Sequence, residues 1–201
     1  MQSFTTVVGP AAALLRANID TDVIVRIERL TSVARDQLGQ YALEALRYRK
    51  DGSEEPDFVL NRPAFRDAPI LIAGKNFGCG SSREGAVWAL MAAGFRCVIA
   101  ESFGDIFYNN CFQNGMLPIV LPAAAVNDLA VQAAEGAPLT IDLVTCQIST
   151  PGGDVISFEV DATRRKALLE GLDDISTTLR DRGDIIAWQV RDRAARPWIW
   201  Q

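Results

Sequence analysis

The chain has 201 residues, of which 49% are hydrophobic and 22% are charged, and it has four cysteines and no histidine. This balance is typical of a folded globular chain and excludes the collagen-like and intrinsically disordered classes. A net charge of −5 does not provide the clustered Lys and Arg that a phosphate backbone requires, so nucleic acid is not an expected partner. We predict a single domain over residues 1–201.

The sequence also argues against a membrane protein. No apolar run approaches the length of a bilayer span, and the N-terminus lacks a basic segment followed by a long apolar one. We therefore expect an unprocessed cytoplasmic protein.

The first third of the chain is predicted to contain two short strands, at 4–8 and 23–25. A helix over 34–48, interrupted near Gly39, follows, and then an exposed loop at 51–57.

The centre alternates apolar strands with helices. In chain order the predicted elements are a strand at 69–74, a helix at 86–94, a strand at 97–101, a helix at 103–115 and a strand at 117–122. Both helices end at a glycine, Gly94 or Gly115, where the left-handed cap conformation carries no penalty. This order predicts parallel strands covered by helices.

The last third is predicted to begin with a helix at 123–136. Two paired strands, 139–149 and 155–160, are joined by a Gly-Gly turn, and terminal helices are expected at 162–171 and 176–192. The fold class is therefore α/β, with extra antiparallel strands beside the central parallel ones.

Cysteine and histidine usage limits the chemistry of the chain. Cys79, Cys97, Cys111 and Cys146 show no CxxC spacing, so we predict free thiols, buried or partly buried, and no metal ligand set of the chain's own. Without histidine the chain cannot supply Ser-His-Asp or Cys-His catalysis. Any base must be another group, or come from another chain.

The segment NFGCGSSREG, residues 76–85, follows the first central strand. Gly78 and Gly80 allow a tight turn and a close approach of the backbone to a ligand. Three polar residues then precede the helix: Ser81, Ser82 and Arg83. Unpaired N–H groups there favour an anion, but an ordinary serine N-cap with Glu84 in the first turn fits equally well. Neither the P-loop nor the nucleophile elbow pattern is present.

Two further segments carry polar groups. NIDTDVI, residues 18–24, places Asp20 and Asp22 before an apolar run, where a turn-closing role is favoured over a catalytic one. ESFGDIFYNNCFQNG, residues 101–115, follows a parallel strand, at the end where open α/β sheets bind ligands. Its aromatic residues are expected in the core.

Together, GKNFGCGSSRE, IAESFGDIFYNNCFQNGMLPIVL and NIDTDVI closely resemble the small subunit of 3-isopropylmalate dehydratase. That subunit corresponds to the swivelling fourth domain of the aconitase superfamily, so the resemblance implies a swivelling β/β/α fold. It covers nearly the whole chain, from NIDTD to FEVDATRRKALLEGLDDISTTL.

The resemblance implies a two-chain enzyme. A large subunit would carry the [4Fe-4S] cluster and the histidine acid and base groups, and this chain would bind no cofactor. The cluster iron would act as a Lewis acid on the departing hydroxyl of a hydroxy-diacid substrate. The implied reaction converts 2-isopropylmalate into 3-isopropylmalate by dehydration and rehydration, in leucine biosynthesis.

The resemblance also assigns roles. Ser81 would be the base, acting as an alkoxide that neighbouring N–H groups, the helix N-terminus and a guanidinium stabilise. Arg83 would bind a carboxylate through two parallel hydrogen bonds. Asp22 would orient groups in the site, and Gly80 and Ser82 would contact the substrate.

Three positions depart from the family pattern. Gly85 stands where the family usually has histidine, Arg26 replaces a proline, and Arg29 stands where an aromatic residue is common. One hypothesis is that Arg26 or Arg29 binds a carboxylate of another 2-substituted malate, in a citraconate, homoaconitate or aconitate hydratase. Solvated surface arginines are equally consistent with the sequence. A non-catalytic diacid-binding module is the remaining alternative.

Overall fold

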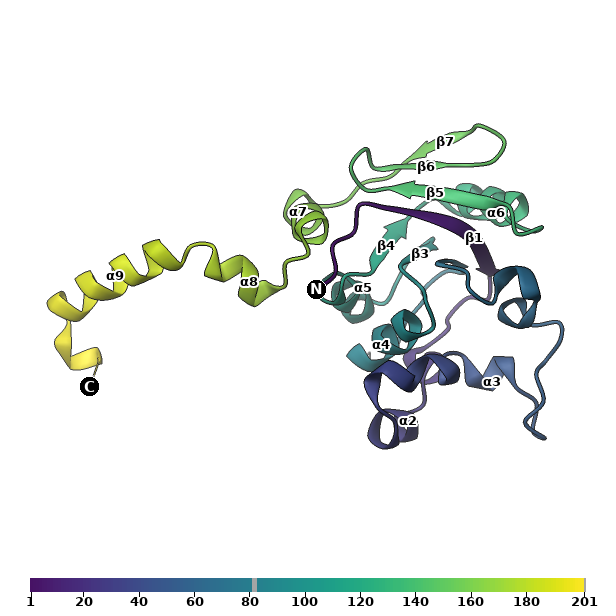
Figure 1. Cartoon of the computed structure of the whole chain (residues 1–201), viewed down its shortest axis with the longest axis horizontal. Coiled ribbons are helices and arrows are strands. Elements are labelled where there is room, and N and C mark those ends of the chain that lie inside the picture. Colours follow the sequence, from purple (N-terminus) through teal and green to yellow (C-terminus); the bar gives the residue numbers. More distant parts are fainter. Residues whose placement is uncertain (81–82, 201) are drawn as a thin grey trace.

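A computed structural model describes residues 1–80 and 83–200 (Figure 1). Within these residues, seven strands form one sheet in the order β4-β3-β2-β1-β5-β6-β7. The strands are β1 (Thr6–Leu14), β2 (Ile70–Ala73), β3 (Cys97–Ala100), β4 (Leu117–Val120), β5 (Pro138–Asp142), β6 (Gln147–Ser149) and β7 (Val155–Ser157). Strands β1 to β4 are parallel, whereas β5 to β7 add antiparallel pairings.

Strand β1 joins the two halves of the sheet. Its residues 11–14 pair in parallel with β2, and its residues 6–10 pair antiparallel with β5. The C-terminal half of β1 therefore belongs to the parallel part of the sheet, and its N-terminal half belongs to the antiparallel part. Figure 1 shows β1 as the long dark strand between β5 and the helical layer.

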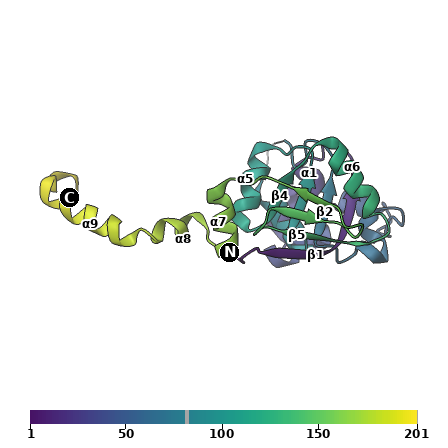
Figure 2. The same cartoon turned by 90° about the horizontal axis from the view of Figure 1, so that it is seen from above.

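Helices cover both faces of the parallel strands. The α-helices are α1 (Thr21–Ile24), α2 (Ile27–Ser32), α3 (Glu44–Arg47), α4 (Glu84–Ala92), α5 (Asp105–Asn114), α6 (Ala123–Gln132), α7 (Ala162–Glu170), α8 (Asp174–Leu179) and α9 (Arg182–Ala195). Helix α4 packs against α5 and against a 3₁₀ segment, Arg35–Tyr41, while α6 contacts β1, β2 and β3. Figure 2 shows α8 and α9 extending away from this body.

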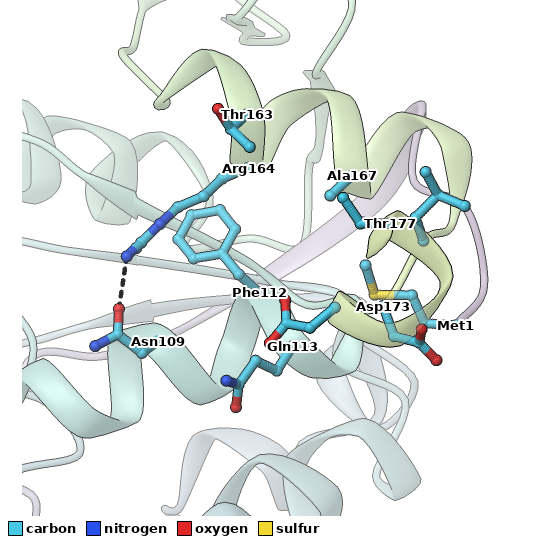
Figure 3. Close-up of a pocket in the computed structure, with 11 residues that line it drawn as sticks. Met1, Asn109, Phe112, Gln113, Thr163, Arg164, Ala167, Asp173 and Thr177 are labelled. Atoms are coloured by element: carbon cyan, nitrogen blue, oxygen red, sulfur yellow. Dashed lines mark hydrogen bonds between the residues drawn. The ribbon is translucent and has the colours of Figure 1, made fainter. Parts of the chain in front are cut away.

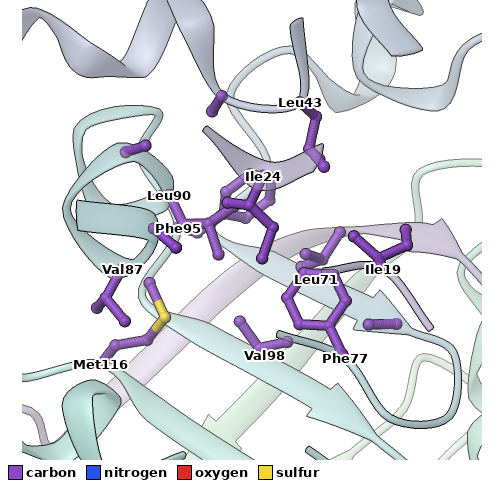
Figure 4. Packing of buried hydrophobic residues seen from close by; sticks show 14 of the residues in the cluster. Ile19, Ile24, Leu43, Leu71, Phe77, Val87, Leu90, Phe95, Val98 and Met116 are labelled. Atoms are coloured by element: carbon purple, nitrogen blue, oxygen red, sulfur yellow. The ribbon is translucent and has the colours of Figure 1, made fainter. Parts of the chain in front are cut away.

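The parallel strands are buried on both faces. Leu71 and Val98 pack into one cluster with residues of α1 and α4, and Figure 4 shows these side chains interleaved. Ile70 and Ile99 belong to a second cluster with α6 and β5. Successive side chains of β2 and β3 point to opposite faces of the sheet, and an apolar core covers each face. Every residue of these two strands is therefore apolar, and the sequence shows a continuous apolar run.

The structure confirms the α/β class and the central alternation of strands and helices. The predicted strand at 23–25 is wrong, because Asp20 caps a helix that begins at Thr21 and buries Ile24. The predicted strand at 139–149 is two strands, β5 and β6, separated by a turn in which Cys146 has a φ of +54°. The interruption expected at Gly39 lies instead at Leu43, whose φ is +58°.

The predicted burial of the thiols is also confirmed. All four cysteines are free; Cys97 and Cys111 are buried and Cys79 and Cys146 are partly buried. Burial raises the pKa of the Cys97 and Cys111 thiols, so neither is a ready nucleophile. Among the described residues, no helix is long and apolar enough to cross a bilayer.

Candidate active site

Three loops meet at the carboxyl ends of the parallel strands. The loop after β1 and the loop after β2 are joined by their backbones: Gly78 N donates to Ile19 O at 2.8 Å, and Thr21 N donates to Cys79 O at 3.2 Å. Asp20 and Cys79 form an isolated parallel bridge there. Two of the three sequence segments that suggested a site are thus side by side.

The third segment joins the same group. Phe77 N donates to Ser102 O at 3.0 Å, and Gly104 N returns a bond to Phe77 O at 2.9 Å. Gly78 has a φ of +69°, and a Cβ on it would lie 2.2 Å from Cγ of Phe107, which is fully buried below the loop. Glycine is therefore needed at position 78 for both conformation and space.

Two asparagines fix the outer side of these loops. The side-chain amide of Asn76 donates to Oδ1 of Asn18 at 2.8 Å, and Asn76 N donates to Oγ of Ser102 at 2.9 Å. Both asparagines have left-handed backbones, with φ values of 56° and 57°. Asparagine tolerates that conformation better than most residues, which explains its use at these two positions.

Asp22 and Arg83 come together across these loops. Oδ1 of Asp20 accepts from Val23 N at 2.8 Å and so caps α1, which places Asp22 in the first helical turn. Nη1 of Arg83 then donates to Oδ1 of Asp22 at 2.5 Å. Arg83 is itself the N-cap residue of α4. The guanidinium and the carboxylate thus stand at the starts of two helices, 61 residues apart in the chain.

The pair is open to solvent, because the Arg83 side chain is 34% exposed and that of Asp22 is 62% exposed. Gly80, which leads into this region, has a φ of +88°. An L-residue would be strained there, and among the described residues its Cβ would lie 3.5 Å from Cβ of Asp20. The predicted base, Ser81, and its neighbour Ser82 lie outside the described residues.

Arg26 and Arg29 lie on or beside α2, next to the site. Both pair with Glu44: Nε of Arg26 lies 3.4 Å from Oε1, and Nη2 of Arg29 lies 3.0 Å from Oε2. The Arg29 guanidinium also stacks over the Tyr41 ring at 4.2 Å. Its hydrogen bond with Glu44 raises the pKa of Arg29. Each arginine therefore already has a carboxylate partner within the chain.

Gly85 occupies the first turn of α4 and is buried. A Cβ there would lie 2.5 Å from one methyl of Leu30, on α2. The space next to the α4 backbone is therefore filled by Leu30, and this contact holds α2 against the start of α4.

A buried amide fixes the same helix from below. Nδ2 of Asn114 donates to Oε1 of Glu84 at 2.8 Å, and its Oδ1 accepts from Nη2 of Arg35 at 2.7 Å and from Nε1 of Trp88 at 3.0 Å. The Arg35 guanidinium in turn covers the Trp88 ring at 4.5 Å. The end of α5 thus determines where α4, and with it Arg83, begins.

In the part of the chain that the structure describes, no three His, Cys, Asp or Glu residues lie close enough together to hold a metal ion. Cys79, in the site loop, is partly buried and has no second cysteine near it in the sequence. These residues do not fit an iron–sulfur cluster; the described part of the site offers a guanidinium and a carboxylate.

Comparisons with known proteins identify the family. The model of the aconitase C-terminal domain matches residues 1–124, and a second model, LeuD_N, matches residues 130–162. The 3-isopropylmalate dehydratase small subunit of Dinoroseobacter shibae is 52% identical over 99% of this chain and 100% of its own length. The chain belongs to the 3-isopropylmalate dehydratase small-subunit family.

Other members agree with this assignment. The small subunit of Jannaschia sp. is also 52% identical, and that of Afipia carboxidovorans is 50% identical, each over 99% of this chain. The crystal structure of 3-isopropylmalate dehydratase (leuD) from Methanocaldococcus jannaschii superimposes with a TM-score of 0.66 at 27% identity. It covers 92% of this chain and 99% of its own. The swivelling-domain fold implied by the sequence is thus confirmed.

Sequence reasoning missed several residues that build the site. The N-cap role of Asp20 could have been predicted, since aspartate is a typical N-cap residue, but the apolar run VIV at 23–25 favoured a strand. No local pattern in the sequence pointed to Glu44 or Asn114, because the arginines that they bind lie 15 and 79 residues away in the chain.

Proposed function

We propose that the chain works as the small subunit of a two-chain hydro-lyase that interconverts 2-isopropylmalate and 3-isopropylmalate, in leucine biosynthesis and in the cytoplasm. Full-length similarity to 3-isopropylmalate dehydratase small subunits is the observation that carries the proposal. The names of these relatives favour 3-isopropylmalate over the other 2-substituted malates.

The geometry supports a specific division of labour. Arg83 presents a planar guanidinium that can hold a substrate carboxylate with two hydrogen bonds, and Asp22 fixes the orientation of that guanidinium. Ser81, two residues earlier, would remove the proton next to the carboxylate. Ser81 shortly precedes Arg83 and α4 in the chain, so we propose that the positive charge of Arg83 and the N-terminal end of this helix would favour its alkoxide form.

The proposed site is incomplete without a partner. Asp22 and Arg83 are exposed, and a low-dielectric, water-excluded site is needed for such electrostatic stabilisation to be strong. A large subunit covering these loops would supply that environment. We propose that it also holds the [4Fe-4S] cluster, which supplies Lewis acidity when bound.

The test is anaerobic reconstitution with the large subunit, followed by an assay of 2-isopropylmalate isomerisation. Ser81→Ala should remove proton exchange almost completely, and Arg83→Lys should lower kcat/KM by about 10²-fold, because one point charge replaces a two-bond contact. Arg49→Lys is the matched control, since Arg49 forms a comparably exposed pair with Glu55. Activity retained by Ser81→Ala would rule out this serine as the base.

A competition assay among diacid substrates tests whether Arg26 or Arg29 determines substrate preference. We expect 2-isopropylmalate to be preferred over citramalate and homoaconitate, and Arg26→Pro and Arg29→Phe to leave that preference unchanged, because Glu44 already pairs with both arginines. A change of preference in either variant would assign a substrate carboxylate to that arginine. Binding of diacid by the isolated chain, without turnover in the complex, would favour a binding module instead.

A further inference from the structure

The C-terminal segment, residues 172–200, extends away from the part of the molecule that contains the sheet. Helices α8 and α9 and a final 3₁₀ turn, Pro197–Ile199, project outward, as both views of the molecule show (Figures 1 and 2). The segment begins just after Gly171, whose carbonyl accepts from the Met1 amine at 3.0 Å. We call residues 182–200 the C-terminal hook.

This segment leaves an unusual amount of apolar surface exposed. Seven large apolar side chains along it are about half exposed or more: Ile175, Leu179, Ile186, Trp188, Val190, Trp198 and Ile199. The exposed fraction is 65% for Val190 and 66% for Trp198. Ile175 and Leu179 belong to α8, and the other five lie in the hook. A large aromatic side chain has about 150–250 Å² to bury, so Trp188 and Trp198 alone expose on the order of 200 Å². Each partner contributes roughly 800 Å² to a stable interface, so the hook can supply a substantial part of one.

The hook is nevertheless ordered by its own contacts. The buried carboxylate of Asp192 accepts from Nε1 of Trp200 at 2.8 Å and from Nε of Arg196 at 2.7 Å. The Trp200 ring lies 6.4 Å from that of Trp188, and the Arg193 guanidinium covers it at 5.0 Å. The chain end is thus folded back onto α9, which holds the indoles of Trp188 and Trp200 in place before any partner binds. Such preorganisation lowers the entropic cost of binding.

The charge of the hook is opposite in sign to that of the chain. It carries four arginines and two aspartates, a net charge of +2 within a chain of net charge −5. A binding surface suited to it would combine an apolar groove for the indoles with acidic side chains at its edge.

We propose that the C-terminal hook docks into such a groove on the large subunit. The proposal rests on the proposed function, which requires that partner. The hook lies within the region aligned with relatives named as small subunits, which match 99% of this chain. Five exposed large apolar side chains in the hook, on a segment common to chains of that name, fit a contact that holds the two subunits together.

The base of the C-terminal segment and the candidate site are at opposite ends of α5. Gly104, at the start of this helix, contacts the site loop, whereas Gly115, at its end, lies beside Met1 and Gln2, where the C-terminal segment begins. Ten residues of helix span about 15 Å. Docking of the hook is therefore a separate contact from closure of the site.

A cavity of about 450 Å³ lies at the base of the segment. Figure 3 shows Asp173 and Thr177 on one side of it and Phe112 and Arg164 on the other. The cavity therefore lies where α8 leaves the body, between residues of α5, α7 and α8.

The experiment compares two valines. Val190→Asp places a charge on the hook, and Val131→Asp places the same charge on α6, where the native side chain is 77% exposed. With a fixed amount of large subunit, we expect Val190→Asp and Trp198→Ala to raise the concentration needed for half-maximal activity about tenfold or more. The kcat at saturating small subunit should stay unchanged, and Val131→Asp should change neither quantity. Circular dichroism verifies that each variant is folded.

Direct binding to the large subunit, measured anaerobically by calorimetry, separates the two proposals. Hook-dependent binding without isomerase activity would contradict the proposed function and leave the docking proposal standing. Activity with undiminished binding of both hook variants would overturn the docking proposal alone. A dimer of this chain in sedimentation that Val190→Asp dissociates, with unchanged affinity for the large subunit, would assign the hook to a second copy and also overturn it.

Discussion

The site loops and the C-terminal hook are built in different ways. In the site, backbone groups of three loops bond one another directly, and buried Phe107 supports them from below. In the hook, order depends on side chains gathered at a single carboxylate, that of Asp192. The first is part of the core, whereas the second is a small structure of its own.

This difference separates the consequences of mutation. A change in the site loops should affect the stability of the whole body, because those loops are continuous with the parallel strands. A change in the hook should leave the body intact and act on association alone. Four measurements test how far this separation holds.

The largest effect is expected at Gly78. In Gly78→Ala the new Cβ would overlap the Phe107 ring in a left-handed backbone, and we expect a loss of about 3 kcal/mol or more in the free energy of unfolding. Gly52→Ala is the control, since Gly52 has a φ of +84° but nothing within 4 Å of the added atom. There we expect a loss of about 1 kcal/mol. Equal losses in denaturant titrations would show that space at position 78 does not matter.

Asn114 should come next. Asn114→Leu leaves Arg35, Trp88 and Glu84 without their common partner, and we expect a loss of about 2–3 kcal/mol, because a buried network is broken. Asn127→Leu, at an exposed position of α6, should change stability by less than about 0.5 kcal/mol. If Asn114 positions α4, its variant should also lower kcat in the reconstituted enzyme. An unchanged kcat would limit this amide to a structural role.

A smaller, coupled effect is expected between Gly85 and Leu30. Gly85→Ala should gain about 1 kcal/mol of helix propensity and lose a similar amount by crowding the Leu30 methyls. In a Leu30→Ala background the crowding disappears, so the same substitution should become stabilising. A double-mutant cycle with a coupling energy of about 1 kcal/mol or more would confirm the contact. Additive effects would show that α2 moves away freely.

The smallest effect is a pH response confined to the hook. Hydrogen bonds from Trp200 and Arg196 lower the pKa of Asp192. The unfolded carboxyl has a pKa of about 3.9, so the hook gains stability above that pH and loses it as the pH falls through the lower, folded value. Near-UV circular dichroism from the Trp188–Trp200 pair should therefore weaken in acid. Asp192→Asn should lack this transition, and an acid-induced weakening that Asp192→Asn retains in full would contradict the assignment.

The sequence predicted the strands and helices of the centre well, because strands β2 and β3 are apolar runs buried on both faces and helix α5 ends at Gly115. It also singled out the three segments that meet at the site. It could not predict that Asp22 bonds Arg83, since the pair depends on how α1 packs beside α4. The hook escaped prediction too: a terminal helix was expected, but the return of Trp200 onto Asp192 has no periodic signal.

The dual pairing of β1 has a consequence for synthesis of the chain on the ribosome. One edge of this strand finds β2 at residues 70–73, whereas the other must wait for β5 at residues 138–142. At about 5–20 residues per second, that edge stays uncovered for roughly 3 to 14 seconds after β2 emerges. An unpaired strand edge is a template for pairing with other chains. The nascent chain is therefore most vulnerable to aggregation in this interval, and chaperones that bind extended segments would act on it then.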